Sequence, residues 1–132
     1  MDLMSLKPTS EVVVVTLMHP VTFETLLKDD GKPMTITMHS PYSKEYKQAV
    51  HEQTDKRISR AQKGKSVTYT ALDMESATLE LMAKATKDWD ITFDGKCPKY
   101  TVSKAMEIYQ DIPWLRDQIE EAVTDTNSFI KG

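Results

Sequence analysis

Four consecutive valines, Val12 to Val15, place the strongest constraint on how this chain folds. Side chains that branch at Cβ lose rotamer freedom in a helix and suit the pleated backbone of a strand. A second segment, Met34 to His39, alternates apolar with polar residues, which is the period of a half-buried strand. Turn-forming residues lie between the two. Residues 11–39 are therefore predicted to form an antiparallel β-hairpin or small meander, in which residues 21–27 form a third short strand or one helical turn.

Helical periodicity dominates the rest of the chain. A first helix is predicted to begin after Ser40 or Ser43, both of which suit an N-cap, and to end at Gly64. Its apolar stripe is narrow and consists of Tyr46, Val50, Thr54, Ile58 and Ala61. A second helix is predicted from Asp73 to about Lys87, with apolar residues on a wide part of its surface.

Residues 89–99 contain turn formers and are predicted to be a loop. A third helix is predicted near residues 102–111, and Pro113 suits the first position of a fourth. The expected fold class is α+β, an N-terminal antiparallel β-hairpin or small meander followed by a bundle of about four α-helices. A single domain is expected over residues 1–132, made of a flexible arm (1–10), the hairpin (11–39) and a helical part (40–132).

The net charge and composition of the chain argue against several classes of function. Seventeen basic and 20 acidic residues give a net charge of −3, which argues against nucleic-acid binding through a global basic field. The local basic cluster is explained by a helix C-terminus and consists of Lys56, Arg57, Arg60, Lys63 and Lys65. No stretch is apolar enough to cross a bilayer, and the start lacks the pattern of a secretory signal. Neither nucleic acid nor a membrane is expected as a partner, and the reducing cytosol is the expected compartment.

One segment comes close to a metal motif. His51 and Asp55 are spaced to share a helix face, and Glu52 lies where the HExxH zinc motif has its base. A catalytic zinc requires a third protein ligand, and His19 and His39 are the remaining histidines. A solvated helix face is the preferred interpretation, so no metal, cofactor or catalytic residue is predicted.

Apolar groups near the end of the chain are candidates for partner binding. The residues chosen are Trp114, Leu115, Phe129 and Ile130, which either dock on the core or contact a partner. The valine-rich hairpin adds a further candidate contact, through pairing of an edge strand. Eight methionines suit either an irregular core or an adaptable binding surface.

The last third of the chain carries a recognisable pattern. It runs through Trp89, Asp94-Gly95, Pro98, Thr101, Ala105, Pro113-Trp114-Leu115, Gln118-Ile119, Ala122, Asp125 and Phe129. This pattern resembles the small tail assembly chaperones of long-tailed, siphovirus-type bacteriophages. The hairpin, with its Asp-Gly turn and the segment Pro33 to Thr37, is also similar to some of these proteins.

The resemblance implies a non-enzymatic role in the host cytoplasm late in infection. Such proteins bind the long, helix-rich tape measure protein, help recruit tail tube subunits during tail polymerisation, and are absent from the mature virion. A homo-oligomer is also expected, because an elongated client is coated by several copies. Two alternatives stay open. One is a structural virion component, either a tail tube or a head–tail connector subunit, and the other is a small metal-binding protein that uses His51 and Asp55.

Overall fold

Three strands and four helices make up most of the described chain, which comprises residues 2–6, 12–62 and 71–125 of a computed structural model. The strands are β1 (Val12–Thr16), β2 (Thr35–His39) and β3 (Thr86–Asp90), and the helices are α1 (Lys44–Gln62), α2 (Ala71–Ala85), α3 (Val102–Asp111) and α4 (Pro113–Thr124). The predicted α+β class is confirmed. Of the predicted arm, residues 3–6 form a short 3-10 helix.

The predicted hairpin is present as the pair β1–β2. The strands are antiparallel, with Val15 opposite Ile36 and Val13 opposite Met38. Val15, Ile36 and Met38 are buried because they face the helices, whereas Val14 on the opposite face is 58% exposed. In the long connection, only isolated bridges form, at Met18–Thr25 and Leu27–Pro33. Residues 21–27 are therefore neither a continuous strand nor a helical turn.

The third strand of the sheet corrects the sequence-based prediction. Residues 86–90 were expected to end the second helix and begin a loop, but they form β3, which pairs antiparallel with β2. The segment contains one apolar residue, Trp89, and its register shifts opposite Thr37 and Met38. Because the buried positions Thr86 and Trp89 are three apart, the alternation that marks a half-buried strand is missing from the sequence.

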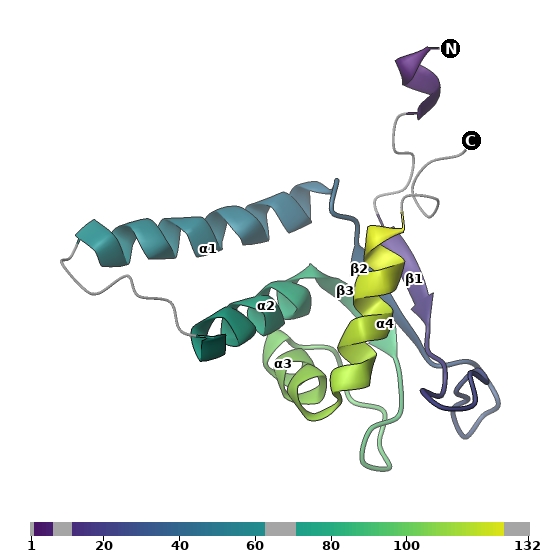
Figure 1. The fold of residues 1–132 in the computed structure, drawn as a ribbon. Coiled ribbons are helices and arrows are strands. Elements are labelled where there is room, and N and C mark those ends of the chain that lie inside the picture. The colour runs from purple at the N-terminus through teal and green to yellow at the C-terminus, as the bar shows by residue number, and fades with distance from the viewer. Residues whose placement is uncertain (1, 7–11, 63–70, 126–132) are drawn as a thin grey trace.

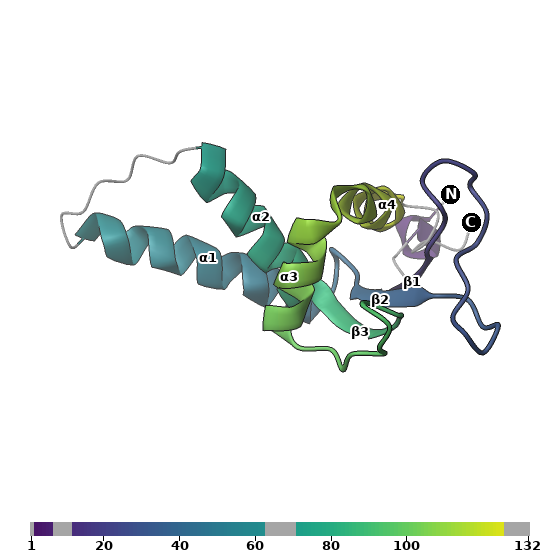
Figure 2. The same ribbon diagram turned by 90° about the horizontal axis from the view of Figure 1, so that it is seen from below.

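The layers are simple (Figures 1 and 2). The strand order is β1-β2-β3, so that β1 and β3 are the edges. Helix α4 lies over one face of the sheet, and none of the described helices lies over the other face (Figure 2). Helix α1 extends away from the sheet beside α2 (Figure 1). The buried core joins the sheet to α2, α3 and α4, and its largest fully buried side chains include Tyr109, Ile36, Ile108 and Ile119.

Helix ends follow local capping chemistry. The amide of Tyr46 donates to Ser43 Oγ, so Ser43 rather than Ser40 caps α1. Thr101 caps α3 by accepting from the amide of Lys104, and Pro113 begins α4 as predicted. Helix α2 begins at Ala71, which places Asp73 in the first turn instead of at the cap. The predicted end of the first helix, Gly64, lies outside the described residues.

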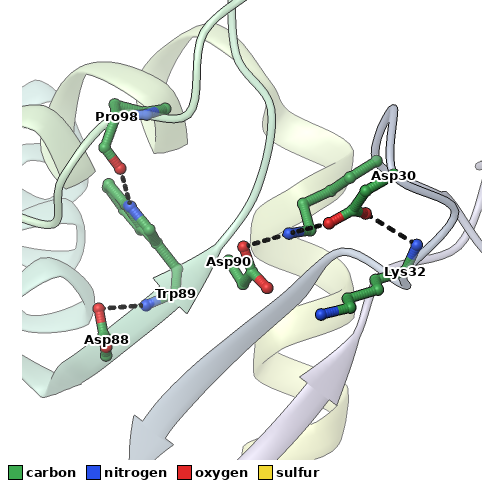
Figure 3. A network of polar contacts seen from close by, with 7 residues as sticks. Asp30, Lys32, Asp88, Trp89, Asp90 and Pro98 are labelled. Atoms are coloured by element: carbon green, nitrogen blue, oxygen red, sulfur yellow. Dashed lines mark hydrogen bonds and ion pairs between the residues drawn. The ribbon is translucent and has the colours of Figure 1, made fainter.

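Polar contacts fix the C-terminal end of β3 (Figure 3). The indole Nε1 of Trp89 donates to the carbonyl of Pro98 at 2.9 Å, which anchors the following loop. Lys28 Nζ lies 2.8 Å from Asp90 Oδ1 and 3.4 Å from Asp30 Oδ2, and these carboxylates raise the pKa of Lys28. The amide of Lys32 donates to Asp30 at 3.0 Å. The connection between β1 and β2 is thus tied to the far edge of the sheet.

Candidate partner-binding groove

An apolar groove opens between the start of α1, the second half of α2 and the second half of α4. Its cavity measures about 310 Å³ and is lined by Met38, Pro41, Tyr46, Thr78, Leu81, Met82, Ala85, Ile119, Glu120, Val123 and Thr124. We call this surface the α1–α2–α4 groove. It joins residues far apart in the chain because the sheet and both helices share one core.

The floor and the walls of the groove differ in burial. Met38 from β2 and Ile119 from α4 form the floor and are 2% and 1% exposed. Leu81 and Met82 on α2 and Val123 on α4 are half-buried. Ile119 and Val123 are four residues apart and therefore lie on one face of α4. Apolar side chains thus remain partly open to solvent along two helices.

The two threonine hydroxyl groups in the groove are already bonded within their own helices. Thr124 Oγ1 donates to the carbonyl of Glu120 at 2.8 Å, and Thr78 Oγ1 donates to the carbonyl of Met74 at 2.9 Å. Such bonds to the preceding turn satisfy the hydroxyl protons within the helix. The groove therefore offers few polar groups that need a partner, and it favours an apolar occupant over a polar small molecule.

The wall formed by α1 is attached to α2 mainly through polar groups. Gln53 Nε2 donates to the carbonyl of Ala77 at 2.7 Å. Glu80 accepts Lys56 and Lys84 at 3.0 Å each, and these ammonium groups lower the pKa of Glu80. Partly exposed ion pairs contribute at most about 1 kcal/mol each.

The residues chosen from the sequence lie elsewhere. Leu115 is 2% exposed and belongs to the core, and Trp114 is half-buried and packs against it. Neither lines the α1–α2–α4 groove. Phe129 and Ile130 lie outside the described residues.

The residues that line the groove were not among those selected from the sequence as a site. The signal that points to them is the wide apolar surface of α2. Leu79 and Ala83 are the α2 residues that fill the core, with exposed fractions of 5% and 0%. Leu81 and Met82, on the same helix, remain partly exposed. Helices α2 and α4 each carry more apolar residues than the core buries. This excess on two neighbouring helix faces indicates an apolar groove between them.

The near-miss metal motif is placed on the exposed surface of α1, where His51 and Asp55 are both exposed. Nδ1 of His19 accepts from the amides of Val21 and Thr22 at 3.1 and 3.2 Å. Nδ1 of His39 lies 3.9 Å from a carboxylate oxygen of Glu45. Within residues 2–6, 12–62 and 71–125, no three His, Cys, Asp or Glu side chains are grouped so as to hold a metal ion.

Comparisons with models of protein families, with curated proteins and with solved structures find no match for this chain. Among the helices that the structure describes, none has the length and apolar character needed to span a membrane. The function is therefore argued from the residues and from the geometry of the groove.

Proposed function

We propose that this chain is a non-enzymatic tail assembly chaperone of a long-tailed bacteriophage, which binds the tape measure protein and helps recruit tail tube subunits during tail polymerisation. The observation that carries the proposal is the open α1–α2–α4 groove, an apolar surface that no described segment covers. The resemblance of the last third of the chain to such chaperones names the partner.

The groove suits the helix-in-groove mode of recognition. In this mode an amphipathic helix places apolar side chains at every third or fourth position into a groove between helices. A long, helix-rich client exposes such faces until it is packed in a tail. Leu81 and Val123 form walls for these side chains, and Met82 repacks around different ones because its side chain is flexible and polarizable.

The same features suit a client that must later be released. Leu81, Met82 and Val123 stay partly exposed in the groove, and among the described residues that line it Glu120 is the one charged side chain. The affinity for the client then comes from apolar contacts, without a buried charged anchor residue. Each copy of the chain is therefore expected to bind the client with modest affinity. Several copies along one client raise the total affinity through multivalency. The chain would act in the host cytoplasm and be absent from the mature virion.

The proposal is tested by co-expression with the long, helix-rich product of the neighbouring gene. The long protein should be soluble and should co-purify only when this chain is present. Val123→Lys and Leu81→Lys, each in the groove wall, should reduce the co-purified amount about tenfold, since each puts a charge into an apolar contact. Ile58→Lys is the matched control, because Ile58 is 51% exposed on α1 and does not line the groove.

Two results would overturn the proposal. The long protein behaving the same with and without this chain would exclude the chaperone role. Retention of this chain in purified particles would favour the structural alternative, a tail tube or head–tail connector subunit. Circular dichroism of each variant separates loss of binding from loss of folding.

A further inference from the structure

The chain contains the tripeptide Asp-Gly-Lys twice, at residues 30–32 and 94–96. Both copies lie in exposed turns, one in the connection between β1 and β2 and the other in the loop after β3. Because glycine has no Cβ, its amide nitrogen is the least hindered nucleophile that can follow an aspartate, and an Asp-Gly bond can rearrange to isoaspartate. The two tripeptides are identical, so a difference in their reactivity comes from the folded structure.

The rearrangement has two steps and needs only water. First, the glycine amide nitrogen loses its proton and attacks Cγ of the protonated aspartic acid. The new C–N bond closes a five-membered succinimide, and the acid hydroxyl and the amide proton leave as one water. Second, a water adds to the backbone carbonyl carbon of the aspartate, and the bond from that carbon to the glycine nitrogen breaks. The chain then continues through Cγ, and the former carbonyl carbon becomes a free α-carboxylate.

Both reacting groups are held by hydrogen bonds at Asp30 (Figure 3). The nitrogen of Gly31 donates to the carbonyl of Lys28 at 2.9 Å. The carboxylate of Asp30 accepts from the amide of Lys32 at 3.0 Å and lies 3.4 Å from Lys28 Nζ. The Lys32 amide and the Lys28 ammonium group lower the pKa of Asp30, so less of the protonated acid that the first step consumes is present.

The same two groups are open at Asp94. Among the described residues, no hydrogen bond reaches the carboxylate of Asp94 or the amide nitrogen of Gly95. A Cβ added to Gly95 would meet no atom within 4 Å, so the space around this residue is empty. The turn is closed by two backbone hydrogen bonds between Phe93 and Lys96, at 2.8 and 3.1 Å. These bonds leave both reacting groups unprotected.

The backbone of the second turn is also the more strained. Asp94 has a φ of 54° and Gly95 a φ of 73°, so both are left-handed. In the first turn the glycine alone is left-handed, with a φ of 83° at Gly31. This conformation costs free energy for a residue with a Cβ, although aspartate tolerates it better than most. Opening the turn releases the strain at Asp94, which favours the local fluctuations that bring Cγ to the nitrogen.

We propose that Asp94 is a site of spontaneous isoaspartate formation in the folded protein, and that Asp30, in the same tripeptide, is protected. The product has the same mass as the original chain and contains one additional backbone carbon between Phe93 and Lys96. This extra carbon disrupts the pairing of the two residues that close the turn. The inference does not depend on the chaperone role, and a failed co-expression would leave it standing.

The test is to incubate the folded chain at neutral pH and body temperature and to follow isoaspartate at each site. Electron-transfer fragmentation of separated peptides identifies the isomer, and methyl transfer by a protein isoaspartyl methyltransferase counts it. Asp94 should react at least about tenfold faster than Asp30, whose extra polar contacts must first break. In concentrated urea the two rates should become similar. Comparable rates in the folded chain, or an unchanged ratio in urea, would overturn the proposal.

Variants separate the protection at Asp30 from the reactivity at Asp94. Lys28→Gln removes the ammonium group and should raise the rate at Asp30 several-fold, whereas Lys28→Arg is the matched control that retains the charge. Asp94→Glu should abolish the product at residue 94, because a glutamate would have to close a larger ring, and should leave the rate at Asp30 unchanged. An unchanged rate at Asp30 in a folded Lys28→Gln variant would contradict the proposal. If this variant fails to fold, the comparison in urea decides.

Discussion

The side-chain amide of Gln118 makes two hydrogen bonds with the backbone of Met18, which lies 100 residues earlier in the chain. These bonds connect α4 to the segment that follows β1, an edge strand of the sheet. Their loss leaves the N–H and carbonyl of Met18 to water, because Met18 is exposed.

Gln118→Ala should therefore lower the free energy of unfolding by about 1 kcal/mol, the net value of one or two exposed hydrogen bonds. Amide exchange at Met18 should accelerate more than exchange at Val15, whose backbone faces β2. Gln118→Glu keeps an acceptor and loses the donor, so an intermediate effect is expected. Urea denaturation measures the change in the free energy of unfolding, and residue-resolved amide exchange measures the change at Met18 and Val15. Unchanged exchange at Met18 would show that the two bonds do not persist in solution.

The buried pair of Tyr109 and Thr86 predicts an asymmetric response to mutation. Thr86 Oγ1 lies 2.7 Å from the Tyr109 hydroxyl and donates its own proton to the carbonyl of Met82, so the tyrosine donates to the threonine. Burial raises the pKa of Tyr109. Thr86→Val leaves that hydroxyl buried without an acceptor and should cost about 2 kcal/mol, whereas Tyr109→Phe should cost about 1 kcal/mol.

The double variant is the decisive control for this pair. With both hydroxyls removed, no buried donor is left without a partner, so the double variant should be no less stable than Thr86→Val alone. Simple additivity of the two losses in urea denaturation would refute this description of the hydrogen bond.

Acid should weaken the attachment of α1 to α2. Lys56 and Lys84 hold the pKa of Glu80 below its ordinary value of 4.5. A lowered folded-state pKa gives stability that is complete above the ordinary value and is lost as the pH falls through the lowered one. The free energy of unfolding should decline below about pH 4.5, and Glu80→Gln should flatten that decline. Urea midpoints measured between pH 3 and 7 test this, and an identical slope in the variant would argue against the ion pairs.

The aromatic residue at the start of α4 should act mainly through stability. Trp114 is half-buried and packs against the core, and Leu115 is 2% exposed. Trp114→Ala should cost about 2–3 kcal/mol, and Leu115→Ala should cost about 3 kcal/mol. Trp114→Phe retains most of the packing and should bind the client normally. Loss of client binding by a fully folded Trp114→Phe would instead make Trp114 a contact residue.

The elements that the sequence predicted correctly are those whose signals are local. The valine run, the candidate cap Ser43 and the proline at the start of α4 each act within a few residues. Strand β3 has no such signal, since Thr86 and Trp89 both contact Tyr109, which lies in a later helix, α3. Strand formation there is imposed by tertiary contacts that override local propensity.

The α1–α2–α4 groove was not predicted from the sequence for a related reason. Periodicity shows that Leu81 and Val123 lie on apolar helix faces, but it does not show which apolar residues the core leaves uncovered. The edge position of β1 likewise depends on strand order, which places β2 and not β1 in the centre. Tertiary packing decides which apolar residues remain exposed, so such surfaces can be recognised only in the folded structure.

Helix α2 ends at Ala85 and β3 begins at Thr86, with no residue between them. A flexible linker would let α2 rotate independently of the sheet. With this direct junction, a rotation of α2 also displaces the backbone of β3. The α2 wall of the α1–α2–α4 groove and strand β3 are thus one continuous piece of backbone, so that an occupant displacing this wall would also move the edge of the sheet.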